Sequence, residues 1–173
     1  MIDLISELVR VGVIQENGRF ACKEKLIPTL SSRLIDINGQ EVFVVTKSGS
    51  VYLSQKDIRQ VQLAKGAIAA AIELLLKQLN VGTNDIDEVF VAGAFGFHLK
   101  PSSLTGIGLL PLVYEQKIRF IGNTAKEGAK AVLLNQDAAL EVVQIGEKIE
   151  IFELSLAPEF QEYCVGSLSF RHF

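Results

Sequence analysis

The stretch that decides the fold class is Glu88-Val89-Phe90-Val91-Ala92, followed by Gly93-Ala94-Phe95-Gly96. An almost wholly apolar run of this length is typical of a strand buried on both faces of a sheet. The glycine-rich turn leads toward Pro101, and proline is favoured in the first turn of a helix. We therefore predict a strand over 88–92 and a helix over 101–110. The order of strand, glycine turn and helix predicts a parallel sheet with crossover helices.

The same order recurs later in the chain. An apolar strand is predicted over 118–121, and it ends in Gly122-Asn123-Thr124. The pattern that follows predicts further elements: helices over 126–135, 137–146 and 158–169, and a weak strand over 148–154. Two repeats of one pattern indicate an α/β fold.

The first third of the chain differs from this pattern, because short β-like runs follow one helix. The predicted elements are a helix over 2–13, strands over 33–37, 41–46 and 51–53, and a long helix from about Ser54 to Asn80. Asn38-Gly39 and Ser48-Gly49-Ser50 are turn signals between the strands. Ser54 and Asp57 form a capping-box pattern. A helix that begins at Met1 has no preceding N-cap residue, so we expect the natural chain to start earlier.

Composition excludes several classes of protein. The chain has 173 residues and a formal net charge of −3, which argues against nucleic-acid binding. No apolar run approaches the roughly 20 residues of a membrane-spanning helix, and no secretory signal is present. Cys22 and Cys164 are the only two cysteines, too few for a zinc or iron–sulfur site. We expect free thiols and a cytoplasmic location.

The two glycine turns are the candidate ligand site, because ligands of open α/β sheets lie beyond the carboxyl ends of the strands. Neither turn is a phosphate-binding P-loop or a Gly-x-Gly-x-x-Gly motif. Taken alone, each could equally be a tight strand-to-helix turn. Lys65 is a second candidate: it lies among small residues of the long helix, where it could reach solvent or hold a ligand.

Longer motifs resemble one family, the reductive activators of corrinoid proteins. The matching stretches are Ile58-Arg59-Gln60-Val61-Gln62-Leu63-Ala64-Lys65-Gly66-Ala67-Ile68, 91–96, 107–111, 121–124, 127–130 and Pro158-Glu159-Phe160-Gln161. The resemblance covers nearly the whole chain. It implies the actin-like (ribonuclease-H-like) fold shared by sugar kinases and heat-shock chaperones, here as a partial nucleotide-binding half-domain with a small α+β insertion.

The resemblance also implies a function and a division of the chain. Residues 1–14 and 81–173 would form the actin-like subdomain, and 15–80 an insertion subdomain whose long helix faces the nucleotide. ATP or ADP with magnesium would bind at Gly93, Ala94, Phe95 and Gly96, flanked by Gly122 and Asn123, with Lys65 nearby. Family members use ATP to reduce a cobalt(II) corrinoid protein to cobalt(I). Their iron–sulfur cluster lies in a part that this C-terminal segment lacks, so we assign no catalytic residue or metal ligand here.

Three readings remain open at this stage. The longer protein of which this segment would be a part could activate a corrinoid iron–sulfur protein or a corrinoid methyltransferase protein. It could instead serve a radical dehydratase or an aromatic-ring reductase through the same fold. The chain could also be a non-catalytic interaction or oligomerisation module without nucleotide binding. The predicted strand at Glu88–Ala92 would have an open apolar edge, and such edges pair with other chains, so we expect either a homodimer or a rearranged edge.

Overall fold

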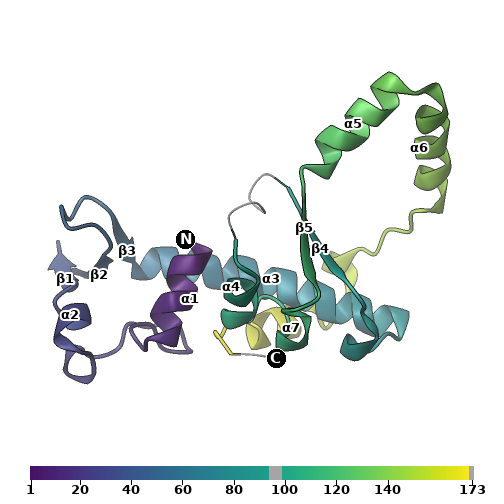
Figure 1. Ribbon diagram of the computed structural model, residues 1–173. Coiled ribbons are helices and arrows are strands. Elements are labelled where there is room, and N and C mark those ends of the chain that lie inside the picture. Colours follow the sequence, from purple (N-terminus) through teal and green to yellow (C-terminus); the bar gives the residue numbers. More distant parts are fainter. Residues whose placement is uncertain (94–98, 172–173) are drawn as a thin grey trace.

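A computed structural model describes residues 1–93 and 99–171, except the side chain of Ser155. Two small sheets are connected by one long helix, α3 (Gln55–Leu79), which extends across the molecule (Figure 1). The strands are β1 (Leu34–Ile37), β2 (Gln40–Val44), β3 (Tyr52–Ser54), β4 (Val89–Ala92) and β5 (Ile118–Gly122). The other helices are α1 (Ile2–Arg10), α2 (Pro28–Ser31), α4 (Pro101–Gly106), α5 (Thr124–Leu134), α6 (Gln136–Lys148) and α7 (Phe160–Gly166). Short 3-10 turns are η1 (Lys23–Lys25), η2 (Thr83–Asp85), η4 (Leu112–Tyr114) and η5 (Leu154–Leu156).

The first sheet is an antiparallel meander in the order β1-β2-β3. Leu34 pairs with Phe43, and Val42 pairs with Ser54. Asn38 and Gly39 both have positive φ, 55° and 78°, as a two-residue hairpin turn between twisted strands requires. The turn predicted from Asn38-Gly39 is therefore confirmed, and the observed strands differ from the predicted ones by no more than two residues at either end.

Helix α3 begins and ends at recognisable caps. The Ser54 hydroxyl accepts a hydrogen bond from the Asp57 amide, while the Asp57 carboxylate accepts from the Ser54 amide at 2.9 Å. This reciprocal capping box confirms the predicted start of the helix. At the other end Asn80 adopts the left-handed conformation, with φ of 52°. The capping residue is thus Asn80 itself, which tolerates positive φ better than most residues.

The second sheet consists of β4 and β5, which pair in parallel as predicted. Val89 lies beside Ile118, and Val91 beside Phe120. On one face of this sheet, Ile118 of β5 forms a hydrophobic cluster with Leu104, Leu110 and Tyr114. On these two strands Phe90 and Ile121 are 58% and 44% exposed, although strands of a parallel sheet are usually covered on both faces.

A larger hydrophobic cluster joins α1, the first sheet and α3. It includes Ile5, Leu34, Ile58 and Phe170, each of which is almost fully buried. Phe170 comes from the C-terminal segment, so the two ends of the described chain share one core. The actin-like α/β class predicted from the sequence has this mixed architecture.

Helices α5 and α6 form a hairpin that extends away from the rest of the chain (Figure 1). They contact each other, and no residue of either helix is buried. The strand predicted over 148–154 is wrong: α6 continues to Lys148, and η5 occupies part of that range. The alternation there was weak, and no described strand lies alongside to complete a ladder. Helix α4 stops at Gly106, short of the predicted Leu110, because glycine weakens helices.

Candidate functional site

The two glycine turns predicted from the sequence meet at one edge of the parallel sheet. The Gly93 amide donates a hydrogen bond to the Gly122 carbonyl at 2.8 Å. Both residues have positive φ, 110° and 72°, which favours glycine. A Cβ atom added at Gly93 would meet no described atom within 4 Å. Among the described residues, nothing beyond its chain neighbours therefore blocks close approach of a flat ligand to the Gly93 backbone. Ala94, Phe95 and Gly96 lie outside the described residues.

Asn123 begins helix α5 directly after Gly122. Its side-chain Oδ1 accepts a hydrogen bond from the Lys126 amide at 3.1 Å. The first turn of an 11-residue helix therefore lies beside the paired glycines. Helix N-termini carry partial positive charge, which favours an anionic group. Gly93, Gly122 and Asn123 are thus brought together at the carboxyl ends of adjacent strands.

Lys65 is buried at 1% exposure in the middle of α3. Its Nζ donates to the Gly108 carbonyl at 3.0 Å and to the Ser169 carbonyl at 2.7 Å. Burial lowers the pKa of the Lys65 ammonium to about 8, because an apolar surrounding disfavours the charged form. These contacts connect α3 with the turn after α4 and with the C-terminal segment.

Sequence reasoning missed Gln62, which is 3% exposed on the same helix. Its Nε2 donates to the Asn17 carbonyl at 3.1 Å and to the Leu168 carbonyl at 3.0 Å. Spacing could have found it, since Gln62 lies four residues after the buried Ile58 and three before Lys65. Two polar side chains on one buried helix face need buried partners.

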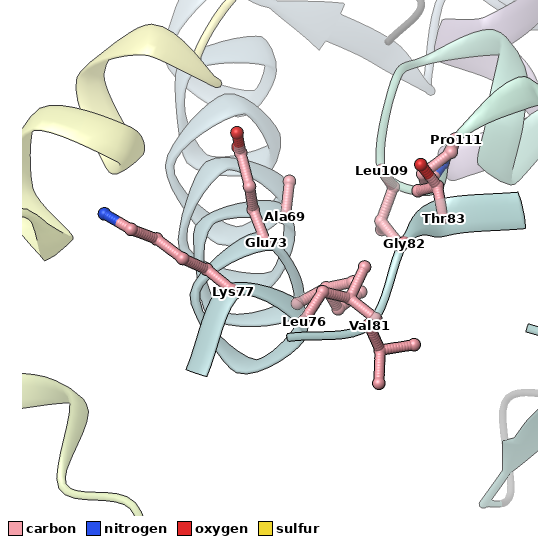
Figure 2. A pocket seen from close by; sticks show the side chains of 10 residues that line it. Ala69, Glu73, Leu76, Lys77, Val81, Gly82, Thr83, Leu109 and Pro111 are labelled. Atoms are coloured by element: carbon pink, nitrogen blue, oxygen red, sulfur yellow. The ribbon is translucent and has the colours of Figure 1, made fainter. Parts of the chain in front are cut away.

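A cavity of about 360 Å³ lies beside the C-terminal half of α3. Figure 2 shows Glu73 and Lys77 on one side of it, with Leu109 and Pro111 on the other. The rest of the lining is mostly apolar: Ala69, Ile72, Leu76, Val81, Gly82 and Thr83. Val81–Thr83 precede β4, whereas Gly93 follows it, so the cavity is lined by different residues from the glycine turns.

None of the groups of His, Cys, Asp and Glu in 1–93 and 99–171 is arranged to hold a metal ion. No helix within these residues is long and apolar enough to cross a membrane.

Comparison with known proteins gives matches along the whole chain. The family described as "C-terminal domain of RACo the ASKHA domain" matches residues 1–173. ASKHA denotes the actin-like fold that the sequence motifs implied. A solved structure, "Reductive activator for corrinoid,iron-sulfur protein", covers 99% of this chain with a TM-score of 0.87 and 28% identity.

Two curated relatives carry related descriptions. "Corrinoid activation enzyme RamQ" of Eubacterium limosum is 33% identical over 170 residues, or 94% of this chain. "[Co(II) methylated amine-specific corrinoid protein] reductase" of Methanosarcina barkeri is 26% identical over 122 residues, or 69% of this chain. The matched regions make up only 29% and 22% of these relatives and 27% of the solved chain. The full-length family match and the shared fold show that this chain belongs to the family of RACo C-terminal ASKHA domains.

Proposed function

We propose that this chain is the nucleotide-binding domain of an ATP-dependent reductive activator whose client is a corrinoid protein. The descriptions of all three similar proteins name corrinoid chemistry. The observation that carries the nucleotide part is the hydrogen bond between Gly93 and Gly122. It joins the first glycines of the two turns at the sheet edge where ligands of α/β folds lie.

The proposed site uses the backbone more than side chains. Adenine and ribose would lie against Gly93, Ala94, Phe95 and Gly96, and Gly122 and Asn123 would flank the cleft. The open Gly93 backbone and the N-terminus of α5 fit a flat, anionic ligand of this kind. ATP or ADP would arrive with magnesium bound to its phosphates. Lys65 stays a predicted nucleotide neighbour. Contact with a ligand would require it to exchange its carbonyl partners.

The redox part of the proposal concerns a longer protein. An iron–sulfur cluster outside this chain would supply one electron, which reduces cobalt(II) to cobalt(I) in the corrinoid protein. Nucleotide binding and hydrolysis would drive the conformational change that makes this transfer possible. The client would be a corrinoid iron–sulfur protein or a corrinoid methyltransferase protein in the cytoplasm. Residues 1–14 and 81–173 would form the actin-like subdomain, and 15–80 the insertion.

We also propose that β4 pairs with the β4 strand of a second copy. The Val89 amide donates a hydrogen bond to the Lys117 carbonyl at 3.0 Å, and the Gly93 amide donates one to the Gly122 carbonyl at 2.8 Å. Both amides therefore point toward β5. Because backbone groups alternate along a strand, the amides of Phe90 and Ala92 then face the free edge. An exposed apolar edge of this kind is a template for pairing with another chain.

Thermal unfolding with and without millimolar Mg-ATP or Mg-ADP tests the nucleotide site. Ligand at 100 times its dissociation constant adds about 2.7 kcal/mol, which raises the Tm by several degrees. Gly93→Val should abolish the Tm shift, because the valine side chain would occupy the space beside the backbone where the nucleotide is proposed to lie. Gly49→Val is the matched control, since Gly49 also has positive φ (77°) and open space around it. An unchanged Tm in the wild-type chain, and in a version extended to the relatives' length, would favour a non-catalytic module.

A further inference from the structure

The C-terminal segment Leu168–Arg171, hereafter the strap, passes between three separate parts of the chain. It follows α7, which packs along α3. Gly66 of α3 permits this approach: a Cβ there would lie 3.1 Å from the Cys164 carbonyl oxygen and 3.1 Å from Leu168 Cδ2. The small residues noted in the sequence thus receive a helix and the strap.

Helix α3 binds the strap backbone with two buried side chains. Gln62 donates to the Leu168 carbonyl at 3.0 Å, and Lys65 donates to the Ser169 carbonyl at 2.7 Å. Each of these donors also binds a second carbonyl elsewhere. Gln62 reaches Asn17, and Lys65 reaches Gly108. The strap, the turn at 15–18 and the turn at 107–109 therefore share their buried hydrogen-bond donors.

The strap also contacts the turn at 15–18 directly. The Phe170 amide donates to the Glu16 carbonyl at 2.8 Å, and the Phe170 ring is 2% exposed within the larger cluster. The exposed Arg171 and Glu16 side chains form an ion pair at 2.8 Å. These contacts hold the strap against the end of the molecule that carries the β1–β3 sheet.

On the other side the strap fits tightly against Gly108. A Cβ built on Gly108 would overlap the Arg171 carbonyl oxygen and lie 3.2 Å from Lys65 Nζ. Gly108 has a φ of 67°. The turn after α4 can therefore approach the strap because residue 108 is glycine.

We propose that the strap is a conformational clasp, with Gln62 and Lys65 as its positioning residues. It holds the turn at 15–18 and the turn at 107–109 in one arrangement across α3, and it opens as a unit. Since α3 runs from the β1–β3 sheet toward the β4–β5 sheet, release of the clasp lets these two parts change their relative orientation. The inference does not depend on nucleotide binding.

Gly108→Ala, compared with Gly49→Ala, tests the clasp in the full chain. Both positions have positive φ, so both alanines introduce similar backbone strain, but only Gly108 touches the strap. Amide hydrogen exchange is the readout. We expect Gly108→Ala to speed exchange about tenfold at Phe170, Gly18 and Leu109 together, since release frees hydrogen bonds to a charged group. Gly49→Ala should affect only its own hairpin.

Lys65→Met, compared with Lys77→Met, is the second test. Lys77 is on the same helix but pairs with Glu159 at the surface. Lys65→Met should reproduce the linked exchange of Gly108→Ala, and Lys77→Met should leave the three segments unchanged. Faster exchange confined to one segment would overturn the proposal. So would an equal rise in the β1–β3 sheet, because the strap would then open only with the whole core.

Discussion

Gly18 lies directly against the side chain of Gln62: a Cβ built at position 18 would be 2.5 Å from the Gln62 Cδ atom. Gly18 also has a φ of 84°. The turn at 15–18 is thus pressed onto the amide that binds Asn17 and Leu168.

Gly18→Ala should therefore destabilise the chain more than a comparable glycine elsewhere. The left-handed backbone costs about 1 kcal/mol for alanine, and displacement of the Gln62 amide adds about 1–3 kcal/mol. Gly12→Ala is the control, because Gly12 has a φ of 76° and open space around it. Urea unfolding monitored by circular dichroism gives both values. If both variants lost the same free energy of unfolding, the Gln62 side chain would be able to move away from position 18 at little cost.

The capping box of α3 predicts a pH dependence of stability. Hydrogen bonds from the Ser54 side chain and backbone lower the pKa of Asp57 below its ordinary value of 3.8. A carboxylate with a lowered folded-state pKa stabilises the fold above its unfolded pKa, and this contribution disappears as the pH falls through the folded value. Asp57→Asn should cost about 1 kcal/mol at pH 7, and the difference from wild type should vanish at low pH. Urea titrations between pH 2 and 7 measure it, with Asp36→Asn as the control for an exposed carboxylate.

Two asparagine caps separate helix stability from nucleotide binding. Asn123 accepts from the Lys126 amide at 3.1 Å, and Asn135 accepts from the Asp137 amide at 2.9 Å. Alanine at either position should cost about 1 kcal/mol through loss of the cap. Only Asn123→Ala should also reduce the Tm shift produced by Mg-ATP, because only Asn123 lies at the proposed cleft. If Mg-ATP shifted the Tm of both variants equally, Asn123 would not be part of the nucleotide site.

The free edge of β4 predicts self-association. Phe90→Pro should raise the dissociation constant of the dimer, because proline removes an amide that faces outward. Phe90→Leu keeps the amide and should dimerise like wild type. Sedimentation velocity over a concentration series distinguishes them. A wild-type chain that stays monomeric at high micromolar concentration would contradict the edge proposal.

We expect that Tyr114 can be replaced by phenylalanine without loss of stability. Its hydroxyl is buried and has no hydrogen-bond partner among the described residues. Burial raises the pKa of Tyr114, which keeps the hydroxyl protonated. Tyr114→Phe should leave the free energy of unfolding within about 0.5 kcal/mol of wild type or increase it, since an unpartnered hydroxyl is removed. Tyr114→Ala, by contrast, should cost about 3–5 kcal/mol through the cavity it leaves. A marked loss for the phenylalanine variant would reveal a partner for the hydroxyl.

Local patterns predicted most of the secondary structure. The Ser54 and Asp57 cap, the Asn38-Gly39 turn and the two strand-to-glycine patterns all depend on nearby residues, so the sequence was sufficient for them. The motifs of the long helix and the glycine turns were specific enough to predict the family. The weak alternation over 148–154 failed because a strand needs a neighbour, which no local pattern supplies.

The contacts made by the C-terminal segment could not be predicted. The sequence predicts that Lys65 either reaches solvent or holds a ligand, and nothing in its surroundings along the chain indicates Ser169 as a hydrogen-bond acceptor. The partners of Gln62 lie far from it in sequence, at Asn17 and Leu168. Only the tertiary structure shows that these two polar side chains of α3 are buried and which groups they bind. The roles of Gly93, Gly122 and Asn123 toward nucleotide stay predictions.

The length of α3 has a mechanical consequence. Twenty-five residues of α-helix form a rod of about 37 Å, at 1.5 Å per residue. One end joins the antiparallel sheet through Ser54, and the other leads into the parallel sheet. A tilt of only about 5° at one end would displace the other by about 3 Å, given the rise per residue of a straight helix. A small rotation of α3 at one sheet would therefore move the other sheet by about the width of an atom without unfolding any part of the chain.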